Sequence, residues 1–67
     1  MIPVIVNGIQ DTVEPGTSVG SFLASKKIDP AVAVVEVNGS IVKRENFGAV
    51  VFNDNDRVEI LRFVGGG

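Results

Sequence analysis

The two side chains that perform much of the covalent and acid–base chemistry in proteins are missing from this sequence. Its 67 residues contain no Cys and no His. Without Cys there is no disulfide, no thiolate nucleophile and no thiol that could carry sulfur, and without His no unperturbed side chain titrates near neutral pH. The serines have no imidazole to activate them, so we expect a protein that is not itself an enzyme.

Carboxylates are the remaining side chains that could hold a metal ion. The eight acidic residues are spread along the chain, and only Asp54 and Asp56 lie close together. This pair lacks the spacing and the distal Glu of an EF-hand loop. We therefore expect no metal site and no permanently bound cofactor.

The charge pattern narrows the choice of partners. The net charge is −2, and the basic residues form no run longer than Lys26-Lys27 and Lys43-Arg44. This pattern argues against nucleic acid and against an anionic membrane as the main partner. No apolar run is long enough to span a bilayer, and Met1 is not followed by the pattern of a secretion signal, so we expect a cytoplasmic protein.

The sequence ends in three consecutive glycines, Gly65, Gly66 and Gly67. Glycine has no Cβ and prefers no single backbone basin, and three residues extend by at most about 10 Å. We interpret residues 65–67 as a flexible tail that presents a sterically bare carboxylate on Gly67. Such a tail can thread a narrow enzyme channel, whereas the plain alternative is a frayed terminus.

The first half of the chain predicts a β-hairpin followed by one helix. A β-branched strand opens the chain, and Asn7-Gly8 supplies the positive φ angles of a type I′ turn before a second strand over residues 9–13. Val19, Phe22 and Leu23 then follow helical spacing, which predicts a helix over residues 17–28 that Asp29-Pro30 ends.

The second half predicts further strands. A strand over residues 32–37, the turn Asn38-Gly39 and a short strand at 41–42 come first, and Phe47 then plugs an irregular segment. A short strand at 50–52 precedes the final run, residues 57–64. In this run Val58 and Ile60 alternate with Glu59, Leu61 and Phe63, so burying the first pair places Leu61 and Phe63 on the opposite surface.

This order of elements predicts an α+β protein of the β-grasp, or ubiquitin-like, type. One amphipathic helix between a hairpin and later strands needs a sheet face to cover its apolar stripe. We expect a mixed sheet of four to five strands around the helix, as a single domain over residues 1–64, with residues 65–67 as the tail. A small open barrel is the alternative.

Four segments carry a resemblance to a known family. They are Val6-Asn7-Gly8, the helix entry at residues 15–19, residues 37–44 around the second Asn-Gly turn, and the ending at residues 56–67. In this order and spacing, over essentially the whole chain, the sequence resembles the ThiS family of sulfur-carrier proteins of thiamine biosynthesis.

The resemblance implies a specific chemistry for the Gly67 carboxylate. In such carriers an adenylating enzyme related to ubiquitin-activating enzymes uses ATP to activate the terminal carboxylate. A sulfur donor such as a cysteine desulfurase then supplies the sulfur of a thiocarboxylate, and thiazole synthase receives that sulfur. By the same analogy Gly65 and Gly66 would enter the partner's channel. From their place on the opposite surface of the final strand, we infer that Leu61 and Phe63 are docking contacts. Packing of Leu61 and Phe63 against the protein's own tail is the alternative for these two side chains.

Three other functions stay open at this stage. The small subunit of molybdopterin synthase is also a β-grasp sulfur carrier that ends in Gly-Gly, although the short entry to the helix here fits the thiamine carrier better. A ubiquitin-like modifier would form an isopeptide bond through Gly67. A plain interaction module would not need its last two glycines.

Overall fold

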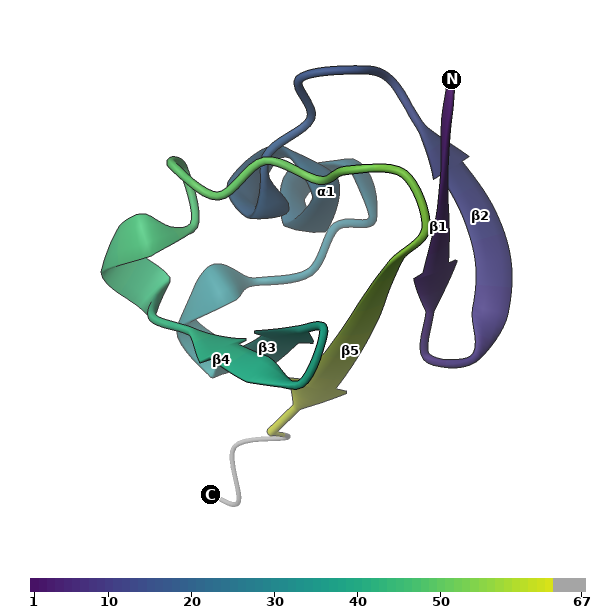
Figure 1. Cartoon of the computed structure of the whole chain (residues 1–67). Helices are drawn as coiled ribbons and strands as arrows, with labels where there is room; N and C mark the ends of the chain where they lie inside the picture. The colour runs from purple at the N-terminus through teal and green to yellow at the C-terminus, as the bar shows by residue number, and fades with distance from the viewer. Residues whose placement is uncertain (64–67) are drawn as a thin grey trace.

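The computed structural model describes residues 1–63 and contains five strands, one α-helix and two short 3-10 helices (Figure 1). The elements are β1 (Ile2–Val6), β2 (Ile9–Val13), α1 (Val19–Ser25), η1 (Pro30–Val32), β3 (Ala33–Val37), β4 (Ser40–Val42), η2 (Arg44–Asn46) and β5 (Asp56–Arg62). The strands form one sheet in the order β2-β1-β5-β3-β4. Strands β1 and β5 are parallel and the other neighbours are antiparallel, so the predicted mixed sheet is confirmed.

Both predicted Asn-Gly turns are present. Asn7 and Gly8 have φ angles of 50° and 81°, and Asn38 and Gly39 have φ angles of 53° and 85°. Two successive positive φ angles define a type I′ turn, whose twist matches that of the flanking strands. These turns fix the register of the β1–β2 and β3–β4 hairpins.

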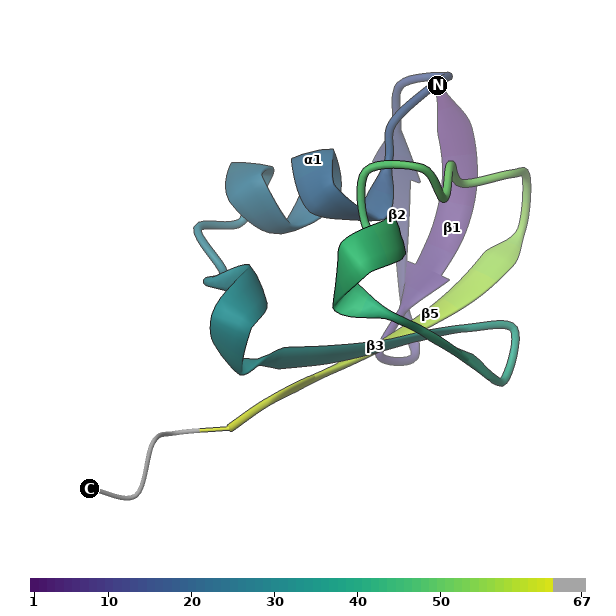
Figure 2. The same cartoon turned by 90° about the vertical axis from the view of Figure 1, so that its left-hand side faces the viewer.

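Helix α1 packs on one face of the sheet, which we call the inner face, and the core lies between them (Figure 2). The rings of Phe22 on α1 and Phe52 meet edge to face, with centroids 5.6 Å apart. Phe47 is buried, as the sequence predicted. The core consists of Val4, Val13, Val19, Phe22, Leu23, Ala33, Val35, Phe47, Phe52, Val58 and Ile60.

Helix α1 is shorter than the sequence predicted. Ser18 caps its N-terminus by accepting a hydrogen bond from the Ser21 amide, and the helix ends at Ser25 rather than at residue 28. Lys27 adopts a φ of 59°, and the amides of Lys27 and Ile28 donate to the carbonyls of Ala24 and Leu23. These two bonds form a Schellman motif, so a left-handed lysine ends the helix before Asp29-Pro30 is reached.

The strand predicted at residues 50–52 does not form. Only an isolated bridge joins Val51 to Ser18. The Val19 amide donates to the Val50 carbonyl and the Phe52 amide donates to the Thr17 carbonyl. The segment therefore pairs with the chain that enters α1 instead of with the sheet, and Phe52 enters the core.

Within residues 1–63, no helix is long and apolar enough to cross a membrane.

Candidate functional site

Leu61 near the end of strand β5 and Phe63 directly after the strand lie on the face of the sheet opposite α1, which we call the outer face. Alternation along the strand leaves Val58 and Ile60 1% and 8% exposed on the inner face, whereas Leu61 and Phe63 are 58% and 60% exposed. The structure thus places these two predicted contact residues on an accessible surface. The other predicted site residues, Gly65, Gly66 and Gly67, lie outside the described residues.

The end of β5 is held by backbone hydrogen bonds. Arg62 is in register with Ala33 of β3, and the Phe63 amide donates to the Val32 carbonyl at 2.8 Å. Because β5 is the middle strand, it is paired on one side with β1 and on the other with β3. Backbone pairing with β3 therefore fixes the path of the chain as far as Phe63.

The two turn asparagines hold β5 from opposite sides. Asn7 Oδ1 accepts from the Ile60 amide at 2.7 Å, and Asn7 Nδ2 donates to the Ile60 carbonyl at 3.2 Å. Asn38 Oδ1 accepts from the Arg57 amide at 2.9 Å, and Asn38 Nδ2 donates to Asp56 Oδ1 at 2.9 Å. Sequence reasoning assigned both asparagines to turns and missed these contacts.

Asp56 anchors the beginning of β5. It is a buried carboxylate, and besides the bond from Asn38 its Oδ2 accepts a hydrogen bond from the Asn53 amide at 2.8 Å. These bonds satisfy a charge that would be costly to bury alone. Strand β5 is thus fixed at its start by Asp56 and near its end by Asn7.

Further apolar side chains extend the accessible surface beyond β5. Val34 of β3 is in register with Leu61 and is half-buried beside it. Ile41 of β4 is strongly exposed on the same face. Sequence reasoning did not select Val34 or Ile41, although the period-2 alternation in residues 33–37 carries the signal for Val34.

Charges border this apolar surface. Glu36 and Glu59 face each other in register across β3 and β5, and like charges in this position repel. Within residues 1–63, the only ion pair joins Lys26 to Asp11 on the inner side, so neither glutamate is neutralised by such a pair. A hollow of 650 Å³ on the outer face is lined by Glu36, Asn38, Gly39, Arg57, Glu59 and Leu61.

Metal-binding geometry is absent from the described part of the chain. In residues 1–63 no three acidic side chains converge on one point. Asp54 and Asp56 are the only two acidic residues close together in the sequence. The carboxylate of Asp56 accepts hydrogen bonds from the Asn38 side chain and the Asn53 amide.

A mixed five-stranded sheet with β1 and β5 parallel at its centre, and one helix across its inner face, defines a β-grasp protein. Within that class, the model of the ThiS family matches residues 4–67. The chain belongs to the ThiS family.

Individual relatives agree with this assignment. The chain is 36% identical over 50 residues to the sulfur carrier protein ThiS of Bacillus subtilis, covering 75% of this chain and 76% of that protein. The crystal structure of the thiamine biosynthesis protein ThiS from Geobacter metallireducens superposes with a TM-score of 0.79 at 37% identity, covering 98% of this chain and 100% of that one.

A third relative is much larger. The chain is 36% identical over 62 residues, or 92% of its length, to a protein named thiazole synthase from Magnetococcus marinus. The chain spans only 19% of the length of that relative.

Proposed function

We propose that this chain is a sulfur carrier of thiamine biosynthesis, and that the carboxylate of Gly67 is the group that carries sulfur. The observation that carries the proposal is the similarity to the sulfur carrier ThiS of Bacillus subtilis over three quarters of this chain. The chain acts as a protein co-substrate in the cytoplasm, not as an enzyme.

The chemistry begins with a carboxylate that is ionised at neutral pH and is a poor electrophile. An oxygen of the Gly67 carboxylate attacks the α-phosphorus of ATP on an adenylating enzyme, and pyrophosphate leaves. The outer sulfur of a persulfide on a donor such as a cysteine desulfurase then attacks the acyl carbon, a C–S bond forms and AMP leaves. A second thiol attacks the donor sulfur of the resulting acyl disulfide, so that the S–S bond breaks, a disulfide forms on the donor and the thiocarboxylate is released. The resulting thiocarboxylate is a nucleophile that can deliver sulfur to an acceptor.

The geometry of β5 supports this role. Four residues follow Phe63 in the sequence, and four residues span at most about 14 Å. A partner that holds Gly67 in its active site must therefore contact the end of β5. Leu61 and Phe63 are the exposed apolar side chains at that end, and we assign them to docking. Gly65 and Gly66 occupy the partner's channel.

The outer face also indicates the chemistry of the partner's surface. A partner that covers Leu61, Phe63 and Val34 also approaches the facing carboxylates of Glu36 and Glu59. Arg57 lines the same hollow, so the two glutamates and Arg57 together carry a net charge of −1. The complementary surface is apolar at its centre and carries a net positive charge at its edge. The similarity to part of a protein named thiazole synthase supports thiazole synthase as the acceptor.

The decisive experiment is intact mass spectrometry of the full chain after incubation with ATP, a sulfide source and a ThiS-adenylating enzyme. The expected product is heavier by the difference between one sulfur and one oxygen atom, and fragmentation places the change on Gly67. A variant lacking Gly67 is the matched control and gains no sulfur. An unchanged mass with an enzyme that modifies the Bacillus subtilis carrier would reject the proposal, and lysine conjugates in its place would indicate a protein modifier.

A further inference from the structure

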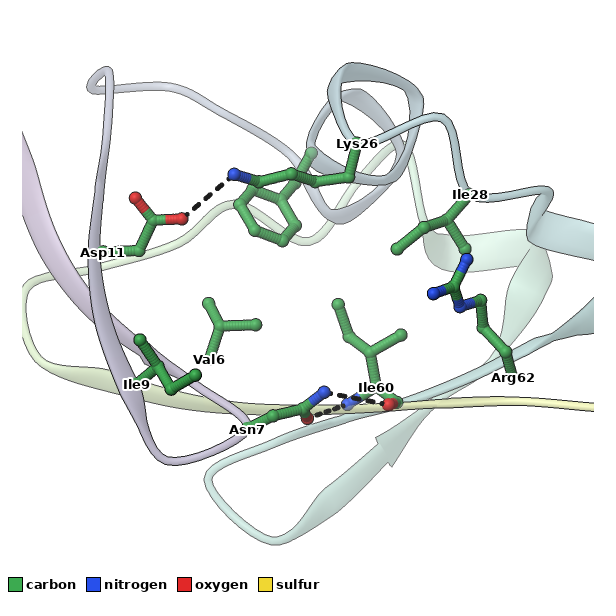
Figure 3. Close-up of a pocket in the computed structure, with 9 residues that line it drawn as sticks. Val6, Asn7, Ile9, Asp11, Lys26, Ile28, Ile60 and Arg62 are labelled. Atoms are coloured by element: carbon green, nitrogen blue, oxygen red, sulfur yellow. Dashed lines mark hydrogen bonds and ion pairs between the residues drawn. The ribbon is translucent and has the colours of Figure 1, made fainter.

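A groove opens on the inner face beyond the C-terminal end of α1 (Figure 3). Because the helix ends at Ser25, the adjoining part of the inner face is left uncovered. Ile9 is in register with Val6 on this face, yet it is 72% exposed. The groove has a volume of 310 Å³.

Apolar side chains form part of the groove lining. The apolar side chains come from the hairpin, the helix, the segment after the helix and β5, and they are Val6, Ile9, Phe22, Ile28 and Ile60. Asn7, Asp11, Lys26 and Arg62 complete the lining. Figure 3 shows Val6 and Ile60 rising from the sheet toward Lys26, with Ile28 on the side of Arg62. An exposed apolar hollow is unfavourable in water, so filling it with an apolar group is favourable.

The charges around the groove are unbalanced. On one side Lys26 Nζ lies 3.2 Å from Asp11 Oδ2, so these two charges neutralise each other. Lys26 also lies over the Phe22 ring, 5.5 Å from its centroid. On the other side Arg62 is exposed, and within residues 1–63 it forms no ion pair. Asp11, Lys26 and Arg62 are the charged residues of the lining, so its net charge is +1, and the unpaired positive charge is that of Arg62.

We propose that this groove binds a small amphipathic anion, with its apolar body against Ile9, Ile28 and Ile60 and its carboxylate or phosphate on Arg62. The planar guanidinium of Arg62 can hold either oxyanion through two parallel hydrogen bonds. The volume of 310 Å³ suits a small ligand, because it lies at the lower end of the range of roughly 300–1,000 Å³ found for ligand pockets. The site is separate from Leu61 and Phe63, which point to the outer face, so it does not depend on the sulfur-carrier proposal.

The test is an NMR titration of the ¹⁵N-labelled full chain with 3-phenylpropionate and benzyl phosphate. Both are expected to shift the amide signals of Ile9, Ile28 and Arg62, with a dissociation constant on the order of a millimolar for so small a ligand. The neutral analogue 3-phenylpropanamide is expected to bind at least about fivefold more weakly, since it lacks the charge that Arg62 recognises.

Two arginines on β5 provide a matched pair of variants. Arg62→Gln is expected to weaken binding of both anions at least about fivefold and to leave binding of the amide unchanged. Arg57→Gln removes the same charge from the opposite face of the same strand and is expected to leave anion binding within about twofold of the parent. The dispersion of each spectrum verifies that the variant is folded.

Three results would overturn the assignment. One is equal affinity for the amide and the anions, and another is equal weakening by Arg57→Gln and Arg62→Gln. The third is a set of shifts centred on Leu61 and Phe63 instead of the groove. Ile9→Ser provides an independent check, because loss of an apolar wall must weaken all three ligands.

Discussion

Asn7 and Ile60 are joined by two hydrogen bonds, although they are 53 positions apart in the sequence. Both polar atoms of the Asn7 side chain are used, one accepting from the Ile60 amide and one donating to its carbonyl. The side chain thus copies the pairing of a neighbouring strand at the point where β1 has already turned away. It connects the first hairpin turn to the strand that leads toward the C-terminus.

Asn7→Gly removes both of these bonds and keeps a residue that tolerates the positive φ of 50°. We expect the free energy of unfolding to fall by about 1–2 kcal/mol, measured by urea denaturation. Asn55→Gly is the matched control. Its φ is 66° and its side chain makes no hydrogen bond within residues 1–63, so its stability should stay within about 0.5 kcal/mol of the parent. Equal effects of the two changes would show that the side-chain bonds contribute nothing.

Lys27→Gly tests the residue that ends α1. A left-handed conformation costs a lysine about 1–2 kcal/mol relative to its usual basins, whereas glycine adopts it freely. Lys27 has a φ of 59° and is exposed, so we expect the glycine variant to be more stable by about 1 kcal/mol in thermal and urea unfolding. Lys26→Gly, at the neighbouring position with a φ of −94°, should instead destabilise the protein. A Lys27→Gly variant no more stable than the parent would contradict this reading of the helix end.

The lowered pKa of Asp11 makes the free energy of unfolding depend on pH. The Thr12 amide, which donates to Asp11 Oδ1 at 2.8 Å, and then Lys26 hold the pKa of the Asp11 carboxyl below its ordinary 3.8. A carboxyl with a lowered pKa stabilises the fold above its unfolded-state pKa, and this contribution is lost as pH falls through the folded-state pKa. Because the pair is partly exposed, Asp11→Asn should cost less than about 1 kcal/mol at pH 7.

The measurement is the difference in free energy of unfolding between Asp11→Asn and the parent, followed as a function of pH and of salt concentration. The gap between Asp11→Asn and the parent should shrink below about pH 4 and should also narrow in 1 M salt. A gap that stays constant from pH 7 to pH 2 would exclude the ionised carboxylate as its source.

Leu61→Ser and Phe63→Ser test docking and rest on the proposed function. Both side chains are exposed, so we expect unfolding midpoints close to that of the parent. Binding to the adenylating enzyme should weaken about tenfold or more, because apolar anchors at the centre of an interface contribute most of its energy. Titration calorimetry with the purified enzyme measures this change. Ile9→Ser, on the inner face, is the control. A loss of binding confined to Ile9→Ser would show that the enzyme docks on the inner face and not on the outer face.

Local patterns in the sequence predicted much of the fold. The Asn-Gly pairs at 7–8 and 38–39 require positive φ angles that few other dipeptides supply, so both hairpins were predictable. Alternation from Val58 onward was enough to place Leu61 and Phe63 on the outer face. These features depend only on neighbouring residues.

Features that depend on distant residues were not predictable in the same way. The helix is terminated by Lys27, which adopts the left-handed conformation usually taken by glycine. A lysine at this position does not indicate a helix end in the sequence. Residues 50–52 have strand-like composition, but their hydrogen bonds go to residues 17 and 19. The hold of Asn7 and Asn38 on β5 exists only once the sheet is assembled, and the groove exists only because α1 stops short.

The central position of β5 has a mechanical consequence. A pull along the chain beyond Arg62 loads β5 in shear against β1 and β3 at once, because both neighbours run alongside it. Under shear the cross-strand hydrogen bonds share the load, whereas a strand peeled from an edge would lose its bonds one after another. If partners hold the chain by its last residues, as we propose, β5 stays paired with both neighbours while the chain is drawn into them.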